Sequence, residues 1–194
     1  MDVAGGKPGL TNNAPSGILK TQGGMLMKIT DESIAKVPLV ESGIVRQSKW
    51  GELQQAHKDL LEHVRDDPIG TEAVAYYSLD MELLTRHKGD AGVGMVEPRW
   101  ISAPHIIIHN HPGGKTFSGQ DFLTFMNNDM SLSISAVGNN GNVFVLEKTR
   151  FAAFASAMDL FISELRTGTE FDIDKFFRDI DRYGYTYRRG DSNA

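Results

Sequence analysis

The chain contains no cysteine, so none of its 194 residues can form a disulfide or a thiolate metal site. It also lacks any run of the ~20 apolar residues that a membrane-spanning helix needs. No basic start followed by an apolar core marks the N-terminus, so no signal peptide is predicted. We therefore expect a cytoplasmic protein without a membrane partner.

Positive charge is also scarce in this sequence. There are 20 Lys and Arg residues against 25 Asp and Glu residues, which gives a net charge of −5. The lysines are scattered, and Arg188-Arg189 forms the basic cluster near the end. This is a poor electrostatic footprint for phosphate backbones and argues against nucleic acid as a partner. Hydrophobic content of 40% and charged content of 23% are ordinary for a soluble globular protein.

Two histidines stand at the end of an apolar, β-branched run at residues 106–108, which predicts a buried strand. His109 and His111 are two residues apart, and side chains at that spacing point to the same face of a strand. Their Cβ atoms would lie about 6 to 7 Å apart, so both rings could converge on one ion. Pro112 then ends the strand.

A carboxylate follows at a distance that suits the same ion. Residues 113–116 predict a turn, and Ser118 begins an apolar-periodic segment that predicts a helix with Asp121 in its first turn. Asp121 could supply a third ligand and leave the fourth position to water, as in catalytic zinc sites. Ser118 and Asp121 also fit an ordinary capping pattern, and paired histidines alone are common. The conjunction of all these features favours zinc held by His109, His111 and Asp121.

The motif resembles the signature of the JAMM (MPN-type) zinc metalloproteases, which is an upstream Glu, His-x-His-Pro, a spacer and Ser-x-x-Asp. Here it reads His109-Asn110-His111-Pro112, then Ser118 and Asp121. The Asn between the histidines and Val96-Glu97-Pro98-Arg99 are similar to the RadC-like branch. The spacer is one residue shorter than the family's, and the helix before the metal strand is nearly absent. The resemblance covers about residues 70–148 and implies an α+β, JAMM/MPN-like (cytidine-deaminase-like) mixed sheet flanked by helices.

The resemblance also implies a reaction, the hydrolysis of a peptide or isopeptide bond. Zinc lowers the pKa of its bound water toward ~7, and a carboxylate outside the ligand set then acts as general base. Glu72, which begins a strand-like run, matches the family's glutamate, and Ser118 would bond the oxyanion. Glu82 is the second choice for the base, and Glu62 and Glu97 are further rivals.

The expected partner is a protein or peptide substrate, because family members hold substrate segments extended beside a sheet edge. Fifteen residues separate Asp121 from Val137, which leaves no room for the downstream insertion of ubiquitin-specific members. The substrate class therefore stays open among a ubiquitin-like or other modifier and a phage or toxin protein. Two other classes remain, a non-catalytic assembly scaffold and a RadC-like DNA-associated protein. The sequence predicts no oligomeric state.

Composition divides the chain into a flexible arm rich in Gly, Asn, Pro and Thr at residues 1–30, a core at 31–150, and C-terminal helices and a tail at 151–194. His57 lies on an apolar helical stripe and is expected in the core, whereas His63, His87 and His105 are expected at the surface. The expected elements of the core are a helix capped by Ser48 and ended by residues 66–70, strands at 73–79 and at either 83–87 or 93–96, and a hairpin at 134–137 and 143–146.

The last part of the chain carries two apolar stripes at residues 151–165 and 171–180. We expect two helices packed on the sheet in preference to a dimerisation face. The tyrosines and arginines at residues 183–189 could contact a partner or form a terminal strand.

Overall fold

The computed structural model describes residues 26–90, 96, 98–166 and 173–190. Its helices and strands follow one another in the order helices, strands, helix, hairpin, helices, strand. The α-helices are α1 (Asp31–Ala35), α2 (Trp50–Val64), α3 (Gly119–Met126), α4 (Phe154–Arg166) and α5 (Ile173–Asp179), with 3₁₀ turns at Gln47–Lys49 and Ile180–Tyr183. The strands are β1 (Ala73–Ser78), β2 (Leu83–Lys88), β3 (His105–His111), β4 (Ser131–Gly138), β5 (Val143–Lys148) and β6 (Tyr185–Gly190).

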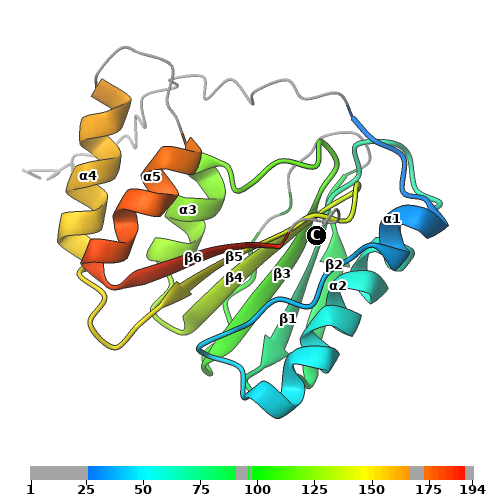
Figure 1. Ribbon diagram of the computed structural model, residues 1–194, viewed down its shortest axis with the longest axis horizontal. Helices are drawn as coiled ribbons and strands as arrows, with labels where there is room; N and C mark the ends of the chain where they lie inside the picture. The colour runs from blue at the N-terminus through cyan, green and yellow to red at the C-terminus, as the bar shows by residue number, and fades with distance from the viewer. Residues whose placement is uncertain (1–25, 91–95, 97, 167–172, 191–194) are drawn as a thin grey trace, which may run out of the picture.

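These strands form one mixed sheet in the order β2-β1-β3-β4-β5-β6. Strands β3 and β4 run parallel, and the other described neighbours run antiparallel. Helices α1 and α2 cover one face, and α3, α4 and α5 cover the other (Figure 1). The α+β class and the mixed sheet flanked by helices, both expected from the sequence, are confirmed.

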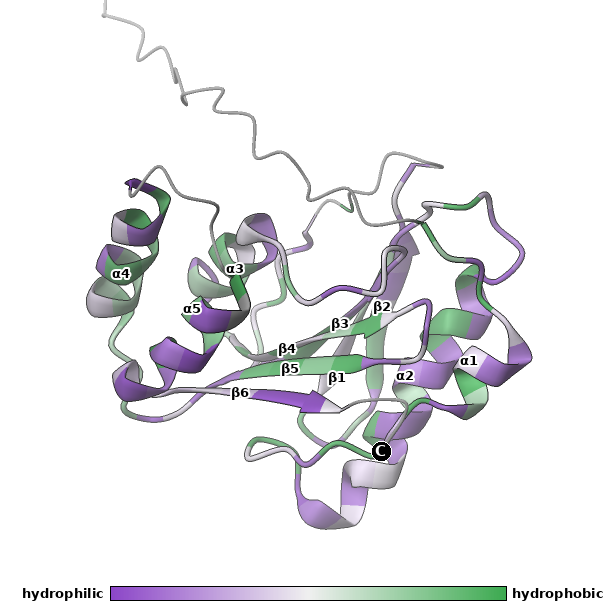
Figure 2. Cartoon of the chain, turned by 45° about the horizontal axis from the view of Figure 1, so that its top comes forward, coloured by the Kyte–Doolittle hydropathy of each residue, from purple (hydrophilic) through white to green (hydrophobic). Residues whose placement is uncertain are grey.

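Each face of the sheet has its own apolar core, because successive side chains of a buried strand alternate between the two faces. In β3, Ile106 and Ile108 pack with α2, whereas Ile107 packs with the phenylalanines of α3 and α5. Figure 2 shows the same distribution, with apolar residues on the central strands and polar residues along the edge strand β6. His109 and His111 have the parity of Ile107 and therefore belong to the α3 face.

Helix α2 forms where its apolar periodicity predicted it, and its stripe, including His57, is buried. The expected Ser48 cap is wrong. Ser48 lies inside the 3₁₀ turn Gln47–Lys49, and Lys49 occupies the N-cap position without a side-chain hydrogen bond. The extra 3₁₀ turn lets the chain enter the helix one residue later than a serine cap would allow.

The hairpin of β4 and β5 is confirmed, with Gly138 N–H donating to the carbonyl of Asn142 at 2.8 Å across the turn. Of the two positions offered for the second strand, the first is right, because β2 spans Leu83–Lys88. Residues 93–95 of the other lie outside the described part, and Val96 is not in a strand. The C-terminal tyrosines and arginines form a terminal strand, since β6 pairs antiparallel with β5.

The C-terminal helices pack on the α3 side of the sheet, but only part of the α4 stripe is covered. Phe161 is buried against Phe122 and Phe176, with ring centroids 5.0 and 5.5 Å away. The expected packing of these helices on the sheet is observed, and Met158 is half-buried, but other large side chains of the first stripe are exposed. The exposed ones are Phe151, Phe154, Ile162 and Leu165. No described helix is long and apolar enough to cross a membrane.

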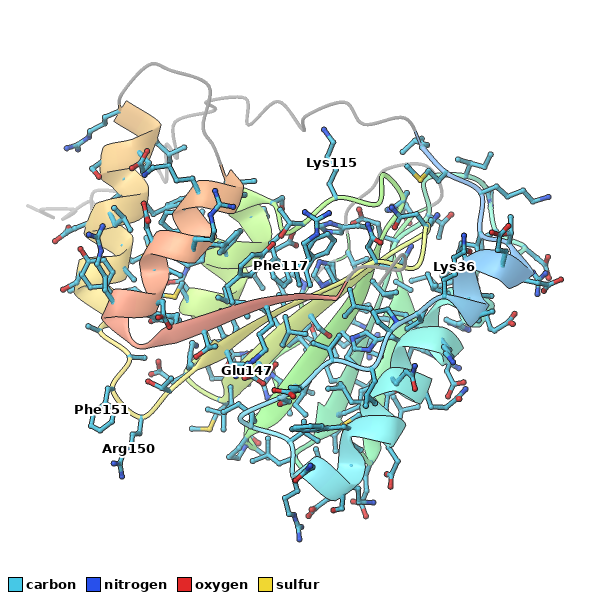
Figure 3. All side chains as sticks on the ribbon, in the orientation of Figure 1. Lys36, Lys115, Phe117, Glu147, Arg150 and Phe151 are labelled. Atoms are coloured by element: carbon cyan, nitrogen blue, oxygen red, sulfur yellow. The ribbon has the colours of Figure 1, made fainter. Side chains whose placement is uncertain are left out.

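A buried carboxylate fastens the segment before α2 to the sheet. Glu147 of β5 is 2% exposed, and its oxygens accept from Ser42 Oγ at 2.5 Å and from Gly43 N–H at 2.9 Å. Arg188 of β6 donates to the same carboxylate at 2.5 Å. Figure 3 shows Glu147 on the sheet face that α2 covers. Further upstream, Met27 N–H donates to the Pro112 carbonyl at 2.9 Å, while residues 1–25 of the expected arm lie outside the described part.

Candidate metal centre

His109 and His111 converge at the end of β3. Their Nε2 atoms are 2.9 Å apart, and the rings meet edge to face with centroids 4.6 Å apart. The strand places them on one face because they are two residues apart. His109 is buried and His111 half-buried, so the pair is largely shielded from solvent.

Asp121 approaches the same point from the first turn of α3. One carboxylate oxygen is 3.4 Å from His109 Nε2, and the other is 3.2 Å from His111 Nε2. All three ligand atoms lie within 4.8 Å of one another. The structure therefore brings together the three residues that the sequence assigned to the metal.

The spacing of these atoms fits a tetrahedral ion. Two ligands about 2.0 to 2.1 Å from an ion at a tetrahedral angle are about 3.3 Å apart. The observed separations of 2.9, 3.4 and 3.2 Å are close to that value. Two imidazoles and one carboxylate form a donor set that suits zinc, and three protein ligands leave one position for water or substrate.

The loop after β3 fixes the tautomer of His111. Its Nδ1 lies 2.9 Å from the carbonyl oxygen of Lys115, and a carbonyl can only accept. Nδ1 therefore carries the hydrogen, and in the neutral ring the lone pair is on Nε2, which faces Asp121. Such a carbonyl partner behind a ligating histidine is the usual way to orient the ring toward a metal. The Lys115 side chain itself points away from the sheet (Figure 3).

Ser118 and Asp121 form a capping box at the start of α3. Asp121 N–H donates to Ser118 Oγ at 3.2 Å, and Ser118 N–H donates to the Asp121 carboxylate at 2.6 Å. Ser118 Oγ also donates to that carboxylate at 2.7 Å. The capping and metal interpretations of Ser-x-x-Asp are thus compatible, because the bonds that cap the helix also hold Asp121 toward the histidines.

The charges in the cluster shift the pKa values of its members. Burial lowers the pKa of His111, but its hydrogen bond to Asp121 and the charges of Asp121 and Glu72 raise it to about 9. Burial raises the pKa of Asp121, and the charge and hydrogen bonds of His109 and His111 outweigh this and hold it well below its usual range. At neutral pH the metal-free cluster therefore holds a proton on His111, beside the charged carboxylate of Asp121. A metal cation would be favoured at the same place.

Glu72 lies across from His111. The antiparallel pairing of β1 with β3 places Val74 opposite His109, and the same register continued by two residues places Glu72 opposite His111. Glu72 shares the face of Val74, which packs in the α3-side core. Burial and the charge of Asp121 raise its pKa to about 7, although the His111 charge lowers it. A half-buried carboxylate with this pKa is suited to general-base chemistry near neutral pH.

The rival carboxylates lie elsewhere. Glu82 is exposed in the turn between β1 and β2, at the opposite end of β1 from Glu72, where its carbonyl accepts from Ser78. Glu62 is exposed on α2 and pairs with Arg65 at 3.3 Å. Glu97 lies outside the described residues. The charge of Glu72 acts on the pKa of His111, and the charges of His111 and Asp121 act on that of Glu72.

The remaining histidines do not join the cluster. His57 is buried in α2 as expected, with Nε2 2.8 Å from Ser135 Oγ, and burial lowers its pKa to about 4. The surface expectation for His105 is wrong. His105 begins β3 and is fully buried, with Nδ1 2.8 Å from the Ala103 carbonyl. His105 is buried because it begins a central strand, and the spacing of the histidines in the sequence carries no signal of this.

Aromatic side chains pack against the cluster. Phe117, fully buried at the end of the loop, lies 6.0 Å from the His109 ring and 5.5 Å from Phe177 of α5. The loop is also tied to β6, since Thr116 Oγ1 and Tyr187 OH are 2.9 Å apart. Figure 3 shows Phe117 pointing inward between the loop and α5. The C-terminal segment, outside the family resemblance, therefore contacts the loop that carries the site.

Two residues that support the elements around the cluster, Lys148 and Asn110, could not be identified from the sequence. Lys148 donates to the carbonyls of Phe125 and Asn128 at 2.7 and 2.8 Å, so it satisfies acceptors at the end of α3. Asn110, which the sequence offered only as a family marker, is fully buried and bonds the backbone beside Glu72. In the sequence, the one local sign of this role was a polar amide between the two histidines at the end of an apolar run.

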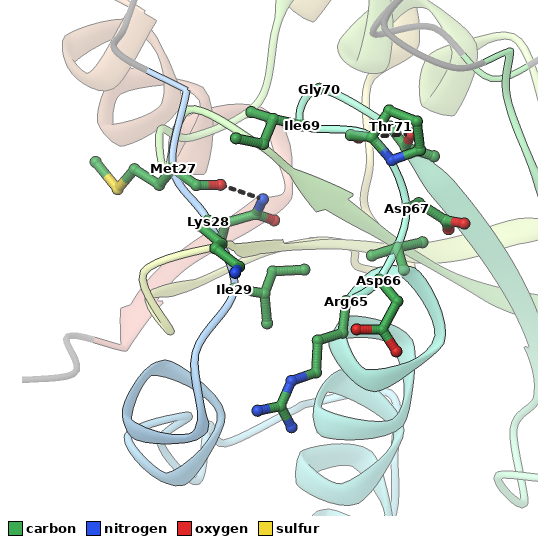
Figure 4. A pocket seen from close by; sticks show the side chains of 12 residues that line it. Met27, Lys28, Ile29, Arg65, Asp66, Asp67, Ile69, Gly70 and Thr71 are labelled. Atoms are coloured by element: carbon green, nitrogen blue, oxygen red, sulfur yellow. Dashed lines mark hydrogen bonds between the residues drawn. The ribbon is translucent and has the colours of Figure 1, made fainter.

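A cleft of about 500 Å³ lies beside the loop that leads from α2 into β1 (Figure 4). It is bordered by Met27, by the loop from Arg65 to Thr71, and by Asn139, whose Nδ2 donates to the Met27 carbonyl at 2.8 Å. His109, His111 and Asp121 do not line it. The chemistry of the metal cluster is therefore separate from this cleft.

Comparisons of the chain with protein-family models, with curated proteins and with solved structures find no match. The function is therefore inferred from the residues of the cluster and their surroundings.

Proposed function

We propose that this protein is a zinc-dependent metallopeptidase of the JAMM type that hydrolyses a peptide or isopeptide bond. The observation that carries the proposal is the convergence of His109, His111 and Asp121 on one point, with Glu72 opposite His111. A structural zinc site would use four protein ligands, whereas this cluster has three and a neighbouring carboxylate with a pKa near 7.

The metal and the general base have distinct parts in this reaction. A bound zinc ion would supply a Lewis acid for the scissile carbonyl and a water whose pKa is about 7. Glu72 would accept a proton from the attacking water and later donate it to the leaving amine, a role worth roughly 10² to 10⁴ in rate. Its pKa of about 7 allows both accepting and donating at neutral pH.

Ser118 is the proposed donor to the negative oxygen that develops on the scissile carbonyl. In the structure its hydroxyl hydrogen is directed at Asp121, 2.7 Å away. Donation to substrate therefore requires rotation of the hydroxyl, while the Ser118 N–H bond of 2.6 Å continues to hold Asp121. The backbone bond lets the side chain change partner without releasing the metal ligand.

The substrate we propose is an extended protein segment held beside a sheet edge. Strand β2 is the nearer of the two edges, since it is separated from β3 by β1 alone. Backbone pairing at an edge aligns a chain without requiring a particular sequence, which suits a peptide or an isopeptide-linked tail. A ubiquitin-like modifier and a phage or toxin protein both satisfy this description.

The proposal is tested with Glu72→Gln in the zinc-loaded full chain, using a randomised fluorescence-quenched peptide mixture and a lysine-linked isopeptide probe. The matched control is Glu82→Gln, which changes the exposed rival carboxylate. We expect equal zinc in all three proteins, and hydrolysis in the wild type and Glu82→Gln that falls at least about 10²-fold in Glu72→Gln. Full activity of Glu72→Gln would overturn the role of Glu72. A zinc-loaded wild type that cleaves neither probe would favour a scaffold.

A further inference from the structure

Asn110 lies between the two histidine ligands but points to the opposite face of β3, because neighbouring side chains on a strand alternate. It is 0% exposed, so its amide must find hydrogen-bond partners within the protein. The partners it finds are the backbone groups on both sides of Glu72. Oδ1 accepts from Ala73 N–H at 2.7 Å, and Nδ2 donates to the Thr71 carbonyl at 3.1 Å.

This arrangement settles the orientation of the amide. A backbone N–H can only donate and a carbonyl can only accept, so Oδ1 must face Ala73 and Nδ2 must face Thr71. The second hydrogen of Nδ2 is directed at Asn139 Oδ1, 3.3 Å away, and Asn139 in turn donates to the Met27 carbonyl. Asn110 therefore anchors the start of β1 to β3 and joins that anchor to the segment before α1.

The anchor lies at the start of β1, just before its described pairing with β3. The described β1–β3 pairing begins at Val74, so Glu72 and Ala73 precede it. On the other side of β1, the Glu72 carbonyl accepts from Gly89 N–H at 2.8 Å. On the β3 side, Ala73 N–H and the Thr71 carbonyl both bond the Asn110 side chain, so losing that amide would loosen the backbone before and after Glu72. The carboxylate of Glu72 could then move away from His111.

We propose that Asn110 is a positioning residue, which holds Glu72 opposite His111 by bonding the backbone before and after it. The catalytic consequence rests on the proposed function, whereas the anchor itself does not. His109, Asn110 and His111 would then combine two tasks on three consecutive residues. The outer two bind the metal on one face, and the middle one places the general base from the other face.

The test uses the full chain with Asn110→Ala and, as a matched control, Asn139→Ala. The control removes a buried amide of the same network but leaves both bonds to Thr71 and Ala73. Hydrogen exchange of single amides is measured by NMR, and zinc per chain by elemental analysis. In Asn110→Ala we expect Ala73 N–H to exchange roughly 5- to 100-fold faster, with Ile106 N–H at the far end of the pairing unchanged. Zinc content should remain that of the wild type in both variants.

Hydrolysis of the peptide mixture gives the second readout. We expect kcat of Asn110→Ala to fall about 10²-fold with little change in KM, as a displaced catalytic group predicts. In a Glu72→Gln background the same substitution should have no further effect, because Asn110 acts through Glu72.

The outcomes separate the anchor from the proposed function. Unchanged exchange at Ala73 overturns the anchor, even if turnover falls. A further loss of kcat in the Glu72→Gln background overturns the action through Glu72. If the wild type binds no zinc or cleaves no probe, the proposed function fails, and the exchange at Ala73 still decides whether Asn110 holds this segment.

Discussion

Zinc and a proton compete for His111, and we expect this competition to make zinc affinity depend steeply on pH. In the metal-free protein burial lowers the pKa of His111, but Asp121 and Glu72 raise it by more, and the result is a pKa of about 9. A ligating imidazole must be neutral, so zinc binding releases the proton at any pH below that value. One released proton raises the apparent association constant tenfold for each pH unit.

The size of the effect follows from the pKa. Between about pH 6.5 and 8.5 His111 is mostly protonated, so apparent affinity should rise about 100-fold, or about 3 kcal/mol at ~1.36 kcal/mol per pH unit. Above about pH 9 the slope should vanish. Glu72, whose pKa of about 7 is raised by burial, steepens the slope at the acidic end because a metal cation favours its charged form.

The assay is a competition between metal-free protein and a chelator of known zinc affinity, corrected for protonation of the chelator, at fixed ionic strength. Glu72→Gln is the informative variant. It removes a charge that raises the pKa of His111, so the slope should persist but level off at lower pH. Zinc affinity that stays flat between about pH 6.5 and 8.5 would refute the account of a proton held in the cluster.

Three further substitutions should separate structural from catalytic roles. Ser118→Ala removes the α3 cap, so we expect a loss of about 1 kcal/mol in urea unfolding and a roughly 10²- to 10³-fold fall in turnover, with zinc retained. Phe117→Ala leaves a cavity beside His109, which should cost about 3 to 5 kcal/mol in the same assay. Arg188→Ala leaves the Glu147 charge buried without its cation, at about 3 kcal/mol, and adding Glu147→Gln should recover part of that loss.

The cluster of His109, His111 and Asp121 was predictable because its signals are local. Strand β3 is a run of isoleucines, and the strand period alone places His109 and His111 on one face. Ser118 marks the start of α3, which puts Asp121 in the first turn. Each inference uses residues within a few positions of one another, so neighbouring sequence was sufficient.

The position of Glu72, the proposed general base, needed more than local signals. Glu72 is opposite His111 only because β1 pairs with β3 in one register, between segments more than thirty residues apart. A slip of one residue would turn Glu72 to the other face. The anchor that Asn110 provides and the contact of Lys148 with the end of α3 also join distant segments.

Burial likewise depended on packing partners that no periodicity identifies. His105 is buried because it begins a central strand of the sheet, although its spacing from other histidines suggested a surface residue. The α4 stripe was correctly helical, yet Phe154 and Leu165 stay exposed because the neighbours described cover only the Phe161 side. Ser48 lies in a 3₁₀ turn, and the N-cap of α2 is the next residue. Sequence patterns rarely fix a helix boundary to within one residue.

The most direct test of the account is the zinc content of the purified full chain, measured by elemental analysis after loading and desalting. Asp121→Ala removes one ligand, and Asp129→Ala changes an exposed aspartate as the matched control, with cooperative unfolding confirming that each variant folds. We predict about one zinc per chain in the wild type and in Asp129→Ala, and none in Asp121→Ala. A wild type that stays free of zinc, or an Asp121→Ala variant that retains it, would contradict the proposed metal centre.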